Sequence, residues 1–163
     1  MERRLIVMRH AQARQPEPGQ TDHQRPLSDL GHRQASEIAQ RLSELGWTPD
    51  LVVSSDAERT RQTWEAMKPN FDPAPEAIWR DDLYLAGVDA AMGVLTALDD
   101  HIGSVLILGH NPGWQAVISY LAGQRERLTP ANAALLQTAA DTWAETAGSQ
   151  GFQLTKVLRP RSL

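Results

Sequence analysis

The chain has 163 residues, of which 41% are hydrophobic and 22% are charged, and its formal net charge at pH 7 is −4. This length suits one compact domain covering residues 1–163. Lys and Arg are scattered rather than clustered, so neither nucleic acid nor a membrane surface is expected as a partner. The chain has no cysteine, which excludes disulfides, thiolate metal sites and a Cys nucleophile. No apolar stretch reaches membrane-spanning length and no signal peptide is recognisable, so we expect a cytoplasmic protein.

Short apolar runs alternate with segments of helical period along the first half of the chain. The loop at 11–27 between the first two elements is rich in proline and long for a compact domain, which is typical of functional or disordered loops. The pattern predicts a strand at 5–8, a helix at 29–45 with Ser28 as N-cap and Gly46 just after it, a strand at 51–53, and a helix whose start is indicated by the capping-box spacing of Ser55 and Glu58.

The second half continues this alternation. It predicts a strand at 77–80, a helix at 90–98 capped by Asp89, a buried strand "SVLILG" at 104–109, and a helix with Asn111 as N-cap, Pro112 as its first residue and Gly123 after its end. In the tail, "ALLQT", "DTWAET" and "FQLTKVL" are interpreted as strands, although the period of the first two also fits helix. This order predicts an α/β fold, a three-layer α/β/α sandwich with a mostly parallel central sheet.

Polar residues follow three of the predicted strands. Arg9 and His10 end the first strand, Ser55 and Arg59 follow the second, and His110 follows "SVLILG". In an open α/β sheet, ligands bind beyond the carboxyl ends of the strands. We therefore expect these side chains to meet at one edge and form a site.

Arg59 indicates what the site binds. A cation in the first turn of a helix is disfavoured by the helix dipole, unless an anion docks between the guanidinium and the free N–H groups. The guanidinium fork matches phosphate or carboxylate oxygens, so phosphate is the expected ligand. Arg61, two residues on, should face elsewhere and is read as a surface residue.

Neighbouring positive charge and burial should keep His10 neutral, and a neutral imidazole is a competent nucleophile. His10 would attack phosphorus while Arg9, Arg59 and His110 hold the non-bridging oxygens. Asp82, preferred over Asp81, is the candidate general acid.

Contacts to substrate are expected from Arg25, Ser55 and Asn111. Asp22 and Arg25 could equally form a salt bridge that anchors the loop, and His23, His32 and His101 are read as surface residues.

The motifs "RHAQA", "SSDAERTRQT" and "GHNPG" resemble, in order and approximate spacing, those of the histidine phosphatase superfamily, which has the phosphoglycerate-mutase-like fold. "RPLSDLG", "DLY", the short length and the terminal "RPRSL" look more like its SixA-type phosphohistidine phosphatase branch. The resemblance implies a phosphohistidine intermediate on His10, a phosphate pocket completed by Arg9, Arg59 and His110, and no metal or organic cofactor. Ala11 stands where the family usually has glycine, and larger members use a glutamate as the acid.

These observations predict a phosphatase that hydrolyses phosphohistidine on a protein, such as a phosphotransfer or carrier domain. A short chain has little material to cover its pocket, and an open pocket suits a side chain displayed on another protein. Two alternatives stay open. A phosphatase of small phosphomonoesters would need the loop at 14–27 to close over the ligand, and a non-catalytic phosphate-binding module would not need His10.

Overall fold

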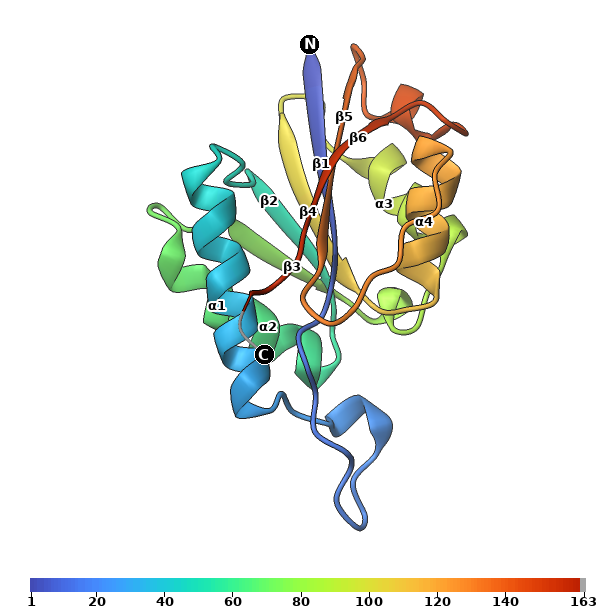
Figure 1. Ribbon diagram of the computed structural model, residues 1–163. Helices are drawn as coiled ribbons and strands as arrows, with labels where there is room; N and C mark the ends of the chain where they lie inside the picture. The colour runs from blue at the N-terminus through green and yellow to red at the C-terminus, as the bar shows by residue number, and fades with distance from the viewer. Residues whose placement is uncertain (162–163) are drawn as a thin grey trace.

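The computed structural model describes residues 1–161 and has a central sheet of six strands. Two residues of the "RPRSL" terminus, 162 and 163, lie outside this range. The sheet has the order β3-β2-β4-β1-β5-β6 (Figure 1). The first four strands are parallel, and β5 pairs antiparallel with both β1 and β6. The strands are β1 (Glu2–Arg9), β2 (Leu51–Ser55), β3 (Glu76–Arg80), β4 (Ser104–Gly109), β5 (Ala133–Ala139) and β6 (Gln153–Leu158).

Helices cover both faces of the sheet, as expected for a three-layer α/β fold. Figure 1 shows α1 (Asp29–Glu44) and α2 (Glu58–Met67) on one side of the strands, and α3 (Val88–Ala97) and α4 (Gly113–Ala122) on the other. Successive residues of a strand point to opposite faces. Ile6 therefore belongs to the core beneath α1, while Val7 belongs to the core beneath α4. Burial on both faces explains why β1 is a continuous apolar run.

The predicted ends of the helices are partly confirmed. Ser28 caps α1, its hydroxyl accepting the Gly31 N–H at 3.0 Å, and Gly46 and Gly123 both have positive φ angles after α1 and α4. The Ser55–Glu58 capping box is wrong, because Ser55 still belongs to β2 and Ala57 occupies the N-cap position of α2. Asp89 likewise lies inside α3, whose N-cap is Gly87.

The tail contains two strands rather than three. "ALLQT" and "FQLTKVL" correspond to β5 and β6, whereas "DTWAET" contributes to a short 3-10 helix at Ala144–Ala147. Trp143 is fully buried just before that turn, and its indole N–H donates to the carbonyl of Ile102 at 2.6 Å. This bond ties the segment to the loop before β4, and the 3-10 helix packs against α3 rather than joining the sheet. None of the helices within residues 1–161 is both long enough and apolar enough to cross a bilayer.

Candidate active site

The carboxyl ends of β2, β4 and β1 bring the predicted site residues together. The three strands are neighbours and parallel, so their ends lie at one edge of the sheet. The N–H of His10 donates to the carbonyl of Gly109 at 3.0 Å, which joins the ends of β1 and β4 directly. The rings of His10 and His110 have centroids 5.4 Å apart. The two histidines therefore face one another across a single site.

His10 is held in one tautomer by its own turn. Its Nδ1 lies 2.7 Å from the carbonyl oxygen of Ala11, and a carbonyl only accepts, so Nδ1 carries the proton and Nε2 carries the lone pair. The residue is 6% exposed, and this burial, aided by the charges of Arg59 and Arg9, lowers its pKa from 6.5 to about 3. His10 is thus a neutral imidazole at physiological pH, with Nε2 free to act as a nucleophile.

His110 is oriented by Ser55. The Ser55 hydroxyl accepts the N–H of Ala57 at 3.3 Å and lies 2.8 Å from Nε2 of His110. In the tautomer in which the Ser55 hydroxyl donates to Nε2, Nδ1 of His110 carries the proton and is a buried donor with no hydrogen-bond partner within residues 1–161. Burial, and then the neighbouring His10 and Arg59, lower the pKa of His110 to about 3. Ser55 positions the second histidine, and its contact with substrate stays a prediction.

Arg59 and Arg9 each keep a buried guanidinium donor without a hydrogen-bond partner within the described chain. Arg59 is 2% exposed, and its Nε has no partner within the described chain, although both Nη atoms are engaged. Arg9 donates from Nη1 to the carbonyl of Leu128 at 3.1 Å, while its Nε is likewise buried and unpartnered. Burial, and then the charges of Arg59 and Arg127, lower the pKa of Arg9. An anion bound between these groups would reduce the repulsion between the two guanidinium groups, and it would accept hydrogen bonds from their unpartnered Nε atoms.

The loop between β1 and α1 reaches this cluster through Asp22. Arg59 donates to the backbone oxygen of Asp22 at 2.7 Å and to its Oδ2 at 3.0 Å, while Arg25 donates to Oδ1 at 2.9 Å. The hydroxyl of Tyr84 donates to the same carboxylate. The hydrogen bond from Tyr84, followed by those from Arg59 and Arg25, lowers the pKa of Asp22 to about 2. Arg25 is therefore a neighbour of the site and anchors the loop, one of the two roles considered for it.

Tyr84 and His23 were not recognised from the sequence. The Tyr84 ring lies edge-on to His110 with centroids 5.4 Å apart, and edge-on to His23 at 4.9 Å. His23, read as a surface residue, contacts Asp56 through Nε2 at 2.8 Å. The only signal in the sequence was the position of Tyr84 two residues after Asp82. Its closeness to the site depends on contacts between segments that are distant along the chain.

Two predicted site residues have other contacts. Arg80 donates to both carboxylate oxygens of Asp82, at 2.9 and 2.6 Å, and this ion pair is exposed and lowers the pKa of Asp82. None of the contacts described for Asp82 is with His10 or His110. Asn111 does not cap α4, whose N-cap is Pro112; its amide donates to Leu128 at 2.7 Å and to Gln115 at 3.0 Å. Asn111 ties together backbone segments that border the site.

The arrangement fits transfer of a phosphoryl group. A neutral imidazole can attack phosphorus, and Arg9, Arg59 and the Nδ1–H of His110 are donors suited to the charge that develops on phosphoryl oxygens. Within residues 1–161, no three or more His, Cys, Asp and Glu side chains are grouped as a metal ion would require.

Comparisons with known proteins agree with this reading. Residues 5–83 match the model of the histidine phosphatase superfamily (branch 1). An uncharacterized chloroplastic protein of Arabidopsis thaliana is 36% identical, over 98% of this chain and 79% of its own length. A candidate SixA phosphohistidine phosphatase from Nakamurella multipartitia superposes with a TM-score of 0.86 at 30% identity, covering 99% of this chain and 98% of that one. The protein histidine phosphatase SixA complexed with tungstate gives a TM-score of 0.83 at 20% identity, with 96% and 97% covered.

Proposed function

We propose that this chain, which belongs to the histidine phosphatase superfamily and to its SixA-type branch, hydrolyses phosphohistidine on proteins through a phosphoryl intermediate on His10. The observation that carries the proposal is the pairing of a neutral nucleophile with ionised carboxylates. His10 is held with a free Nε2, while the pKa values of Asp22 and Asp82 are both lowered. Asp82, the candidate acid, and Asp22, the carboxylate bonded to Arg59, thus have no proton to give at neutral pH, which favours a substrate whose leaving group needs no general acid.

Phosphohistidine is such a substrate. Nε2 of His10 forms a bond to phosphorus while the bond from phosphorus to the substrate nitrogen breaks. If the other ring nitrogen of the substrate carries a proton, the leaving group is a neutral imidazole, the same species as the attacking His10. The exchange is nearly symmetric and requires no general acid, whereas an alkoxide leaving group from a phosphomonoester requires a proton.

The second step returns the enzyme to its starting state. Water attacks phosphorus, the bond to Nε2 of His10 breaks, and the electron pair of that bond returns to the imidazole. One oxygen of the released phosphate comes from water, and the displaced water proton passes to the phosphate or to a carboxylate. Asp22, which is bonded to Arg59, has a pKa of about 2 and is a weak base, so the released phosphate is the expected proton acceptor.

The contact between Asp22 and Arg59 also affects binding of the phosphoryl group. Arg59 is bonded to the Asp22 carboxylate, and this is the guanidinium that would hold phosphoryl oxygens. A phosphoryl group must therefore compete with Asp22 for Arg59, either by displacing it or by sharing the guanidinium. Arg9 and Nδ1 of His110 have no carboxylate of this kind among their described partners.

One observation favours the second candidate, a phosphatase of small phosphomonoesters. The loop containing Asp22 projects beyond the strand ends in Figure 1 and touches the site through Arg59 and Tyr84. Such a loop could cover a small ligand, which the phosphomonoester alternative requires. It would still leave the reaction without a protonated acid at either Asp22 or Asp82.

The proposal is tested by phosphate release from matched substrates. A histidine-phosphorylated carrier protein, free phosphohistidine, and sugar and aryl phosphates would each be assayed with wild type, His10→Ala and Asp82→Asn. We expect the highest kcat/KM for the carrier protein, loss of turnover in His10→Ala, and less than about twofold change in Asp82→Asn because that residue is paired with Arg80. A preference for a phosphomonoester, with a large loss in Asp82→Asn, would reject phosphohistidine and restore Asp82 as the acid. Normal turnover by His10→Ala would remove the intermediate.

A further inference from the structure

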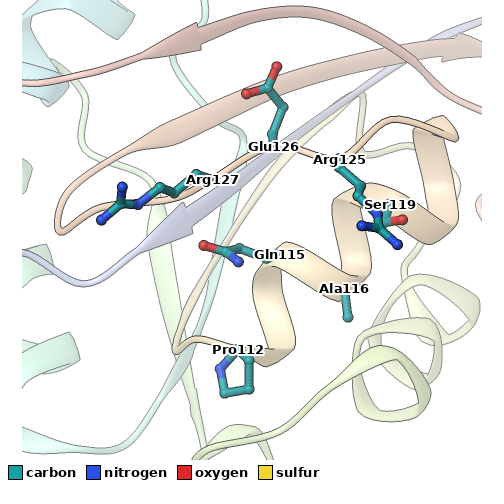
Figure 2. A pocket seen from close by; sticks show the side chains of 7 residues that line it. All are labelled: Pro112, Gln115, Ala116, Ser119, Arg125, Glu126 and Arg127. Carbon is teal, nitrogen blue, oxygen red and sulfur yellow. The ribbon is translucent and has the colours of Figure 1, made fainter.

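A groove with a volume of about 590 Å³ lies beside the catalytic residues, between α4 and the segment that leads to β5. Figure 2 shows that one wall is the exposed side of α4 and the other is the segment at 125–127. The residues that line it are Pro112, Gln115, Ala116, Ser119, Arg125, Glu126 and Arg127. The catalytic chemistry described above does not use this groove.

The charge of the groove is positive. Arg125 and Arg127 are exposed, and neither has an ion-pair partner within residues 1–161. Glu126 points away from both arginines in Figure 2 and pairs with Arg159, whose Nη2 lies 3.2 Å from its Oε2. The acidic residue between the two arginines is thus neutralised by a residue that does not line the groove, and the two positive charges remain available.

The groove is connected to the active site by a short hydrogen-bond path. Gln115, in the wall of the groove, accepts the amide of Asn111 at 3.0 Å and the backbone N–H of Leu128 at 2.9 Å. The carbonyl of Leu128 in turn accepts from Arg9 of the phosphate site. The segment that carries the two arginines is therefore fixed relative to the histidines, and Arg127 is close enough to Arg9 to lower its pKa.

We infer that this groove binds acidic side chains that flank the phosphohistidine on a protein substrate. The inference rests on the proposed function and adds a determinant of specificity to it. The groove shares Gln115 with the hydrogen-bond path that leads to Arg9, its unpaired charges are cationic, and its volume of about 590 Å³ exceeds what a single phosphate needs. An acidic stretch of polypeptide whose phosphohistidine reaches His10 would bring carboxylates to Arg125 and Arg127. A second phosphate of a small bisphosphate would offer similar chemistry and is distinguished by the test.

The test uses two short synthetic peptides, each phosphorylated on one histidine and identical except that glutamates or glutamines flank it. The ratio of kcat/KM for the glutamate peptide to that for the glutamine peptide would be measured for wild type, Arg125→Gln/Arg127→Gln and Arg33→Gln. Arg33 is an exposed arginine on α1, away from the groove, and controls for the removal of a positive charge elsewhere on the surface. Taking the ratio cancels effects of the substitutions on the phosphate site itself.

We expect wild type and Arg33→Gln to favour the glutamate peptide about fivefold at low salt, and the double variant to lose that preference. A wild-type ratio near one, or a preference that survives in the double variant, would overturn the inference. If the double variant loses turnover of a sugar bisphosphate relative to its monophosphate but keeps the peptide ratio, the groove binds a second phosphate and not a peptide. Failure of wild type to hydrolyse either phosphopeptide while it hydrolyses phosphomonoesters would instead reject the proposed function.

Discussion

Two buried arginines near opposite ends of the parallel strands have opposite hydrogen-bond environments. Arg3, near the start of β1, is 1% exposed and donates through all three guanidinium nitrogens to the backbone carbonyls of Asp100, Ile102, Ala140 and Asp141. Its guanidinium also lies 5.5 Å from the centre of the Trp143 ring. Arg59, just after β2, is equally buried but keeps an unpartnered Nε within the described chain.

The difference separates a structural arginine from a functional one. A buried guanidinium whose three nitrogens are all bonded to backbone carbonyls contributes to the fold rather than to ligand binding. A buried guanidinium beside two neutral histidines that keeps a donor without a partner can give a hydrogen bond to a bound anion. Burial of charge alone therefore does not identify a site, whereas burial together with an unmet donor does.

Arg59→Gln should produce the largest effect of the substitutions that test this contrast. Loss of the cation that stabilises the phosphoryl transition state should lower kcat/KM about 10³-fold, while the midpoint of thermal unfolding changes little. Steady-state kinetics and calorimetry on the same preparation check both statements. A large loss of stability with activity retained per folded molecule would mean that Arg59 has a structural role, as Arg3 does.

Arg3→Met should show the reverse behaviour. The substitution leaves several carbonyls without their donor, so the free energy of unfolding should fall by about 3 kcal/mol. Activity per folded molecule should stay within about twofold, because Arg3 lies at the other end of β1 from His10. Chemical denaturation and active-site titration measure the two quantities. A variant as stable as wild type would contradict the claim that Arg3 stabilises the fold.

Acid should destabilise the protein through the two buried histidines, His10 and His110. Their folded pKa values of about 3 lie below the unfolded value near 6.5, so between these limits the unfolded chain binds more protons and stability falls as pH falls. Lowering the pH from 7 to 5 should cost about 2 kcal/mol for each histidine. Urea unfolding of wild type and His10→Asn checks this, and the variant should depend less on pH. Equal dependence in both would mean that His10 is not held neutral.

Asp22→Asn should have the smallest effect of the four. Removing the ionised carboxylate that pairs with Arg59 should strengthen binding of inorganic phosphate about fivefold, because phosphate then meets less competition. Isothermal titration of phosphate into both proteins measures it, with Asp82→Asn as the control that removes a carboxylate paired elsewhere. Weaker binding in Asp22→Asn would mean that Asp22 orients Arg59 for phosphate rather than competing with it.

The sequence predicted the strand ends and their meeting point because both depend on local patterns. Apolar runs identify buried strands, parallel order puts their ends at one edge, and Ser28 and Gly46 mark the ends of α1 by their own chemistry. The roles of Ser55 and Tyr84 could not be read in this way. Ser55 has the spacing of a cap but bonds His110, and Tyr84 contacts a residue in a distant loop. Such contacts exist only once the chain has folded.

The most direct test of the account is to trap the phosphoryl group on the enzyme. Wild type would be mixed with a histidine-phosphorylated carrier protein, quenched rapidly at alkaline pH, digested, and analysed by mass spectrometry for phosphopeptides. The account predicts an acid-labile phosphoryl group on the peptide that contains His10, formed and lost fast enough to match turnover and absent in His10→Ala. A phosphoryl group on the His110 peptide, or full turnover with no phosphorylated enzyme, would contradict it.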